Sequence, residues 1–350
     1  MVKQADQAKK TSAYAQAGVD IDSKMSGIEI IKKMVATTKT KGVVGGIGSF
    51  GGLFQSPGKE MLLVASTDGV GTKLKVAALA KKHDTVGQDI VNHCVNDILV
   101  QGAKPLFFMD YIGTSRFDTD IFTDVISGLV KACKENDCAL LGGETAEMPG
   151  LYSLGEYDLV GTIVGVVEKR KVITGKAIQP GDIMIGLPSG GLQTNGYSLA
   201  RKVIFDQCGL MHQDSIPGTR ITVAEALLAV HRSFLKPVSA LLAKHISIRG
   251  MAHITGGGFI DNIPRVLPDK CNAIIDRASW LPPMVFNFIE RQGKVDRDEM
   301  YRVFNMGIGY IIIVRQADVK KTLDLLQAMK TAPVIVGKIE KGSRKVLYKN

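Results

Sequence analysis

Residues 61–73 read MLLVASTDGVGTK, an apolar run that leads directly into an acid set among small residues. The run 61–65 predicts a buried strand, because short apolar stretches bounded by turn residues commonly pack as strands. Gly69 and Gly71 allow the backbone to approach a bound group closely. Ligands of α/β layers collect where strands end. This stretch therefore predicts a mixed α/β fold with a polar site that begins at Asp68.

Amphipathic helices and apolar strands occur on both sides of this stretch. Residues 85–101 predict a helix whose apolar face includes Val86, Ile90 and Ile98 and which Gly102 ends. Further strands are predicted at 106–112, 139–141, 159–167, 183–187, 310–314 and 334–339, and further helices at 26–37, 121–136, 197–207, 224–243 and 317–329. The order of elements is too irregular for a repeated βαβ sheet.

The length of 350 residues suits two domains better than one core. A charged connector at 168–176 separates two halves, and the pattern of strands and helices begins anew after it. We therefore predict two tandem α+β domains, 1–170 and 171–350.

Composition excludes several classes of protein. The chain is 45% hydrophobic and 22% charged, as globular proteins are. Its longest apolar runs fall far short of the ~20 residues of a membrane span, and the polar segment 1–17 lacks the apolar core of a secretory signal. Five cysteines without a CxxC pair favour free thiols over zinc or disulfides. We expect a cytoplasmic protein without a membrane partner.

The net charge of +10 raises nucleic-acid binding as an alternative function. The basic residues are spread along the whole chain, however, and the densest clusters, at 9–10 and 169–171, are short and free of interleaved aromatics. A basic surface that favours phosphate substrates accounts for the charge. We therefore expect no nucleic-acid partner.

Three acids follow or face predicted strands: Asp68, Glu144, and Asp97 on the helix between them. Carboxylates that meet in one pocket repel each other unless a cation lies among them, and Mg²⁺ carrying ATP phosphates is the usual cation. Lys73 adds a positive charge beside this site. Alternatively, each acid is an ordinary turn or helix-capping residue.

Asp89, His93 and Asp97 recur at i, i+4 and i+8 and so share one helix face. This spacing imitates a ladder of metal ligands. Because a charged face of this kind is more commonly solvated, we assign a function only to Asp97.

Two glycine-rich loops suggest phosphate contacts. Gly46 and Gly48 belong to a GxGxxG pattern that does not follow a predicted strand, so a flap over phosphates or a plain flexible loop fits better than a dinucleotide site. Gly256–Gly258 precede a helix start and predict a phosphate site at its N-terminus. No GxxxxGK[ST] motif is present, which excludes a Walker-type ATPase.

In combination, the motifs resemble those of the phosphoribosylformylglycinamidine cyclo-ligases, also called aminoimidazole ribonucleotide (AIR) synthetases. The resemblance covers nearly the full length. It rests on the segments 14–22, 66–73, 83–85, 94–97, 101–103, 105–111, 142–150, 195–199, 252–259, 262–269 and 304–309.

The resemblance implies two AIR synthase-type domains and a homodimer built through the N-terminal one. It implies ATP-dependent ring closure of formylglycinamidine ribonucleotide with Mg²⁺, and a monovalent cation such as K⁺ is a further candidate. A structural core histidine is the alternative at position 253. The assigned residues are Asp97, His253 and Asn195 for catalysis; Asp68, Asp97 and Glu144 for the metal; Gly46, Gly48, Thr67, Gly69, Gly71, Lys73, Gly143 and Thr145 for ATP; and Gln193, Asn195, Gly256, Gly257 and Gly258 for the substrate.

The chain departs from the family pattern at Gln193, where the resemblance leads us to expect a histidine. An amide hydrogen-bonds but does not shuttle protons near neutral pH, so we expect Gln193 to orient or cover the substrate. Selenophosphate synthetases, which are related, are the alternative enzyme class. They usually use a reactive cysteine or selenocysteine near a glycine-rich N-terminal loop, whereas the first cysteine here, Cys94, lies inside a predicted helix.

Overall fold

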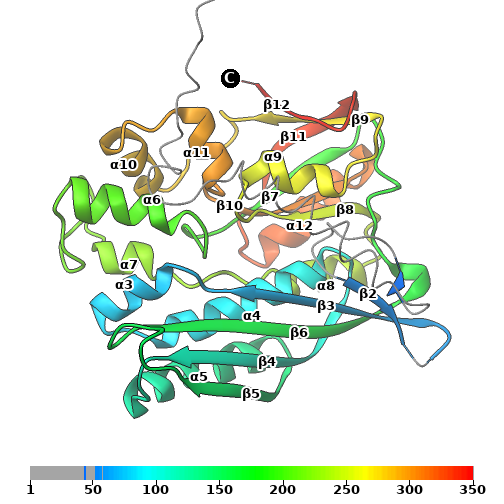
Figure 1. The fold of residues 1–350 in the computed structure, drawn as a ribbon. Coiled ribbons are helices and arrows are strands. Elements are labelled where there is room, and N and C mark those ends of the chain that lie inside the picture. The colour runs from blue at the N-terminus through cyan, green and yellow to red at the C-terminus, as the bar shows by residue number, and fades with distance from the viewer. Residues whose placement is uncertain (1–42, 45–51, 57, 350) are drawn as a thin grey trace, which may run out of the picture.

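The computed structural model describes residues 43–44, 52–56 and 58–349. Two α/β halves, each built on one sheet, lie against each other, with the N-terminal half in blue to green and the C-terminal half in green to red (Figure 1). The helix expected at 26–37 and the glycines Gly46 and Gly48 lie outside the described residues. Within them, no helix is both long enough and apolar enough to span a membrane.

The described part of the N-terminal half forms a six-stranded sheet in which neighbours pair antiparallel, except that β4 and β5 run parallel. Strand β6 alternates buried and half-buried residues along its whole length, so the described residues cover one face of the sheet more fully than the other. The strand expected at 139–141 is longer and continues to Glu147. In sheet order the strands are β1 (Val43–Val44), β2 (Gly52–Gln55), β3 (Met61–Gly69), β6 (Tyr157–Glu168), β4 (Lys104–Thr114) and β5 (Ala139–Glu147), and the helices are α3 (Lys73–Ala80), α4 (Asp84–Leu99) and α5 (Thr119–Glu135).

The C-terminal half is a second six-stranded sheet, and only β12 and β9 pair parallel. Both halves mix helices with a sheet, which confirms the predicted tandem α+β fold. In sheet order the strands are β12 (Val346–Lys349), β9 (Cys271–Asp276), β11 (Val334–Lys341), β7 (Ile183–Pro188), β10 (Ile308–Val314) and β8 (Ile248–His253). The helices are α6 (Tyr197–Arg201, continued by a π-helical stretch Lys202–Gln207), α7 (Val223–Leu227), α8 (Leu235–Ala243), α9 (Gly258–Asn262), α10 (Met284–Gln292), α11 (Arg297–Val303) and α12 (Val319–Ala328).

The single helix predicted at 224–243 is wrong. The chain forms α7 and α8, and an irregular segment at 228–234 separates them. Pro237 lies in the first turn of α8, where a missing N–H does no harm, but it cannot continue a helix that began at residue 223. The interrupting segment runs along α4 and carries His231 into the interior, where this residue is 0% exposed.

Side chains of α4 satisfy the backbone of that segment. The His231 N–H donates to Asp89 Oδ1 at 2.6 Å, and Asn92 Nδ2 donates to the His231 carbonyl at 2.8 Å. The Phe234 N–H donates to Asn96 Oδ1 at 2.9 Å. Buried backbone groups need such partners, and here a helix from the other half supplies them. We call this contact the α4 seam; together with the sheet and α5 of its own half, it buries every residue from Thr85 to Leu99.

A buried ion pair fixes the seam. Lys73 Nζ lies 2.7 Å from Asp89 Oδ2, and neither side chain is exposed to solvent. The same ammonium donates to the carbonyls of Gln193 at 3.2 Å and Ala229 at 2.8 Å, both in the C-terminal half. Burial lowers the pKa of Lys73 and raises that of Asp89, and the attraction between the two charges opposes both shifts.

We predict that Lys73→Met lowers the free energy of unfolding by about 3–5 kcal/mol, because the Asp89 carboxylate is left buried and unpaired. Denaturant unfolding of the full chain measures this loss. Lys75 is the matched control, because it lies on the same helix and pairs with Glu156. The side chains of Lys75 and Glu156 are substantially exposed, 41% and 35%. Lys75→Met should change stability far less, because solvent screens the surface pair.

A Lys73→Met and Asp89→Asn double variant should lose less than the sum of its single variants, because neither charge is then left alone. Equal losses for Lys73→Met and Lys75→Met would contradict the view that the buried pair holds the seam.

Candidate functional site

The polar face of α4 lies at the centre of the candidate site. Asp89, His93 and Asp97 are 0%, 3% and 5% exposed, because the C-terminal half covers this face. The expectation that the face is solvated is therefore wrong. Sequence reasoning set Asp89 and His93 aside, although their i, i+4 spacing was a usable signal. Nothing local in the sequence shows that a second domain covers the helix.

Three imidazoles meet beside this face, and we call His93, His231 and His253 the histidine cluster. Their ring centroids lie 5.0–5.1 Å apart. His93 Nε2 is 2.9 Å from Asp68 Oδ2 and 3.7 Å from Asp97 Oδ2. His253 Nδ1 is 2.8 Å from Asp97 Oδ1, and His253 Nε2 is 3.0 Å from His231 Nε2. The fold thus brings together three sequence-assigned residues, two of them from the N-terminal half.

The two carboxylates give the histidine cluster its electrostatics. Burial alone would lower the pKa of His93, but Asp68 and Asp97 outweigh it and raise that pKa to about 9. Burial would raise the pKa of Asp68, but the charge and hydrogen bond of His93 lower it to about 2. Burial lowers the pKa of both His231 and His253. A positive charge is therefore favoured at one place in the cluster, between the two acids.

Access to that place is from the Asp68 side. The Asp68 side chain is 42% exposed, whereas the His93 side chain is 4% exposed. Asp97 is held from behind by Ser66, whose hydroxyl donates to Asp97 Oδ2 at 3.0 Å. The acids therefore form a pocket wall with one accessible carboxylate and one buried carboxylate.

The loop at 190–196 reaches the histidine cluster from the C-terminal half. Thr194 Oγ1 lies 2.8 Å from His93 Nδ1 and 3.3 Å from His231 Nδ1. Gln193 adopts a left-handed backbone with φ 64°, and its side-chain amide is buried without a hydrogen-bond partner among the described residues. Asn195 is half-buried, and its Oδ1 lies 3.1 Å from the position of a Cβ built on Gly256.

The glycines 256–258 form a tight turn between β8 and α9. Gly258 has no room for a side chain, since an added Cβ would lie 2.0 Å from the Tyr301 carbonyl oxygen. Asn262 Nδ2 donates to the Gly258 carbonyl at 2.7 Å and to the Gly256 carbonyl at 3.3 Å, so these carbonyls point toward the protein. Gly256 itself is exposed beside Asn195.

The remaining metal candidate, Glu144, lies elsewhere on the sheet. Asp68 pairs with Gly161 on β6, which pairs with Asp110 on β4, which pairs with Gly143 on the edge strand β5. Three strand spacings of about 4.8 Å separate the ends of this row by about 14 Å. Two ligands of one Mg²⁺ lie only about 4 Å apart, so Glu144 cannot share an ion with Asp68 within one subunit.

The residues assigned to ATP are dispersed. Thr67 bonds Thr162 through their hydroxyls at 2.8 Å, on the sheet face away from α4. Gly69 and Gly71 follow Asp68 toward α3, while Gly143 and Thr145 lie on β5. The structure contradicts the assignment of Lys73 to ATP. All three N–H donors of its ammonium group are used inside the protein, so none is left for phosphate.

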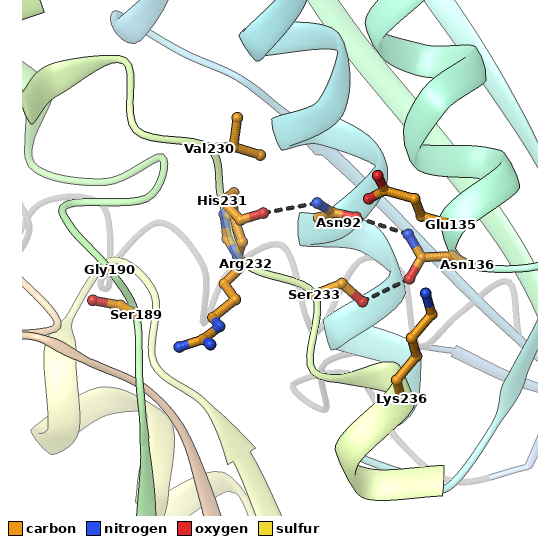
Figure 2. A pocket seen from close by; sticks show the side chains of 10 residues that line it. All are labelled: Asn92, Glu135, Asn136, Ser189, Gly190, Val230, His231, Arg232, Ser233 and Lys236. Atoms are coloured by element: carbon orange, nitrogen blue, oxygen red, sulfur yellow. Dashed lines mark hydrogen bonds between the residues drawn. The ribbon is translucent and has the colours of Figure 1, made fainter. Parts of the chain in front are cut away.

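A pocket of about 430 Å³ opens between the two halves on the far side of the His231 segment. Figure 2 shows its wall, where a row of hydrogen bonds joins the His231 carbonyl to Asn92, Asn136 and Ser233. Arg232 and Lys236 line the same pocket. A second pocket, of about 530 Å³, is lined by Thr145 together with residues of β4 and α5.

Comparisons with known proteins agree with this architecture. The family described as "AIR synthase related protein, N-terminal domain" matches residues 49–167, and its C-terminal counterpart matches 179–350. The phosphoribosylformylglycinamidine cyclo-ligase of Alkaliphilus metalliredigens is 46% identical over 337 residues, which cover 95% of this chain and 97% of that protein. The cyclo-ligase of Syntrophus aciditrophicus is 48% identical over 336 residues, covering 95% and 96%.

Solved structures share the fold at low identity. The hydrogenase maturation protein HypE in complex with ATP has a TM-score of 0.61 at 18% identity, covering 82% of this chain and 81% of that one. A thiamine-monophosphate kinase from Stenotrophomonas maltophilia has a TM-score of 0.59 at 16% identity, covering 90% and 94%. The near-complete match to named relatives is far closer, and the chain therefore belongs to the AIR synthase related family, among the phosphoribosylformylglycinamidine cyclo-ligases.

Proposed function

We propose that this protein closes the imidazole ring of aminoimidazole ribonucleotide in purine biosynthesis. The formyl oxygen of formylglycinamidine ribonucleotide receives the γ-phosphoryl group of ATP and becomes a good leaving group. The substrate's amidine nitrogen then attacks that carbon and loses a proton, and phosphate departs as the ring closes. The observation that carries this proposal is the 46–48% identity to cyclo-ligases over 95% of the chain.

The protein's main contribution is to position the substrate and to balance phosphate charge, which are the usual sources of rate in phosphoryl transfer. We assign the substrate's phosphate to the exposed turn at Gly256, with Asn195 beside it. Gly257 and Gly258 shape this turn. His253 is fully buried, so its role is to position Asp97 rather than to touch the substrate.

We assign the phosphate-bound Mg²⁺ to Asp68 and Asp97. The fit rests on their carboxylates, which both face His93 Nε2 from within 3.7 Å and so converge where a positive charge is favoured. Mg²⁺ at this place neutralises phosphate charge. Gly71 offers a backbone N–H nearby, whereas the Gly69 N–H donates to Asp68 Oδ1 at 2.7 Å and so holds that carboxylate in place. Glu144 and Thr145 lie on β5, at a position separate from these two acids.

We also propose a cytoplasmic homodimer that binds neither nucleic acid nor membranes and that takes K⁺ as an accessory cation. The dimer would form through the sheet face that points away from α4. Val160 and Val164 lie half-buried on this face, and Met109 and Leu141 are 37% and 63% exposed. Apolar surface of this kind on an open sheet favours a second copy as its cover.

The reaction predicts a strict stoichiometry. ADP and aminoimidazole ribonucleotide should form in a 1:1 ratio when the purified protein receives ATP, Mg²⁺ and formylglycinamidine ribonucleotide, because one phosphoryl transfer closes one ring. A coupled ADP assay with chromatography of the product measures both. Comparable ATP turnover with selenide or thiamine monophosphate instead of the nucleotide would reject the assignment.

Gln193 provides a second prediction. Its side-chain amide is buried and its backbone carbonyl accepts from Lys73, so we expect Gln193 to shape the loop that carries Asn195. Gln193→His should leave kcat within about tenfold, a barrier change of about 1.4 kcal/mol, because no proton-transferring group is missing. Gln193→Ala should mainly raise the KM for the ribonucleotide. Steady-state kinetics separate the two effects, and a hundredfold gain in kcat for Gln193→His would contradict this role.

A further inference from the structure

Donor atoms of three buried side chains converge beside Asp68. His93, Asp97 and His253 each offer one ligand atom, and these atoms lie within 4.8 Å of one another. Asp68 Oδ2 is a fourth oxygen, 2.9 Å from His93 Nε2, on the side open to solvent. Two imidazoles with one or two carboxylates form the donor set of many transition-metal sites, whereas Mg²⁺ prefers oxygen ligands alone.

The ring nitrogens that face away from this point are held in one consistent pattern. His93 Nδ1 lies 2.8 Å from Thr194 Oγ1, which leaves Nε2 directed at the acids. His253 Nε2 lies 3.0 Å from His231 Nε2, which leaves Nδ1 directed at Asp97.

His231 completes the pattern. Its Nε2 also lies 3.2 Å from Asn96 Nδ2, which can only donate, so His231 Nε2 accepts and its Nδ1 carries the hydrogen toward Thr194. His253 then donates from Nε2, and its Nδ1, like His93 Nε2, faces a carboxylate oxygen, so a bound cation would take the place of the proton that each nitrogen shares with that oxygen. Metal-binding histidines are oriented in this way, each donating its other N–H to a neighbouring group.

We propose that His93, His253 and Asp97, with Asp68 closing the accessible side, bind one first-row transition-metal ion such as Zn²⁺, Co²⁺ or Mn²⁺. The proposal deepens the proposed function, because it rests on the placement of a cation between Asp68 and Asp97. It adds that the imidazoles of His93 and His253 make the place between Asp68 and Asp97 prefer a transition-metal ion to Mg²⁺. The bound ion would lie between Asp68 and His93. Thr194 and His231 would hydrogen-bond the outward-facing nitrogens of the ligands His93 and His253.

The test is a titration of the chelator-treated full chain with Co²⁺ alone, without nucleotide. Visible d–d absorption and calorimetry should report one ion per chain, which Zn²⁺ displaces and equimolar Mg²⁺ does not. His93→Asn removes a ligand and should weaken binding by at least about tenfold. Thr194→Val removes an outer hydrogen bond and should weaken it by about 10–100-fold, with altered d–d bands. His245→Gln, at an exposed histidine, is the matched control and should bind as the parent does.

Several outcomes would overturn the proposal: absence of a Co²⁺ spectrum, loss of binding in His245→Gln, or unchanged binding in both His93→Asn and Thr194→Val. Melting curves recorded without metal show whether each variant is folded. If His93→Asn is not folded, Co²⁺ binding to Thr194→Val decides whether the proposal stands. Ring-closure turnover with Mg²⁺ is measured separately. Turnover without Co²⁺ binding rejects only the metal inference, and Co²⁺ binding without turnover rejects only the cyclo-ligase function.

Discussion

The buried pair of Lys73 and Asp89 is the interaction on which the rest of the molecule depends. It places opposite charges where two halves of the chain meet, and each charge also bonds the backbone of the C-terminal half. Because both ions are satisfied, the polar face of α4 can be buried at all. Along the same face, His93 of the histidine cluster lies one helical turn further on, and Asp97 lies two turns further on.

Much of the fold could be predicted from local pattern. Strands such as β3 and β10 are apolar runs, and α4 and α5 have clear helical periodicity, so their existence needs no tertiary information. The prediction of one helix at 224–243 is wrong because tertiary contacts, which local pattern does not show, interrupt it. Its interruption depends on Asp89, Asn92 and Asn96, side chains more than 130 residues earlier, which accept and donate in place of helical hydrogen bonds.

The candidate site could likewise be predicted only in part. Asp68 and Asp97 could be identified from strand ends and motif resemblance, and the structure places them around one imidazole. His93 was visible in the spacing but was set aside, because burial of that face is a property of the other domain. Lys73 was misassigned for a related reason: its sequence neighbours suggest phosphate, but its donors are used internally. The distance of Glu144 follows from strand order, which local sequence does not encode.

The α4 seam also bears on whether the two domains are independent units. The break between β6 and β7 divides the chain into two segments by connectivity, yet α4 completes the interior of both. A fragment containing only the second segment would leave the backbone of 231–234 without partners, and one containing only the first would expose the charged face of a helix. Folding of either half therefore waits for a contact across about 140 residues of sequence, which favours slow, concerted assembly over sequential folding of modules.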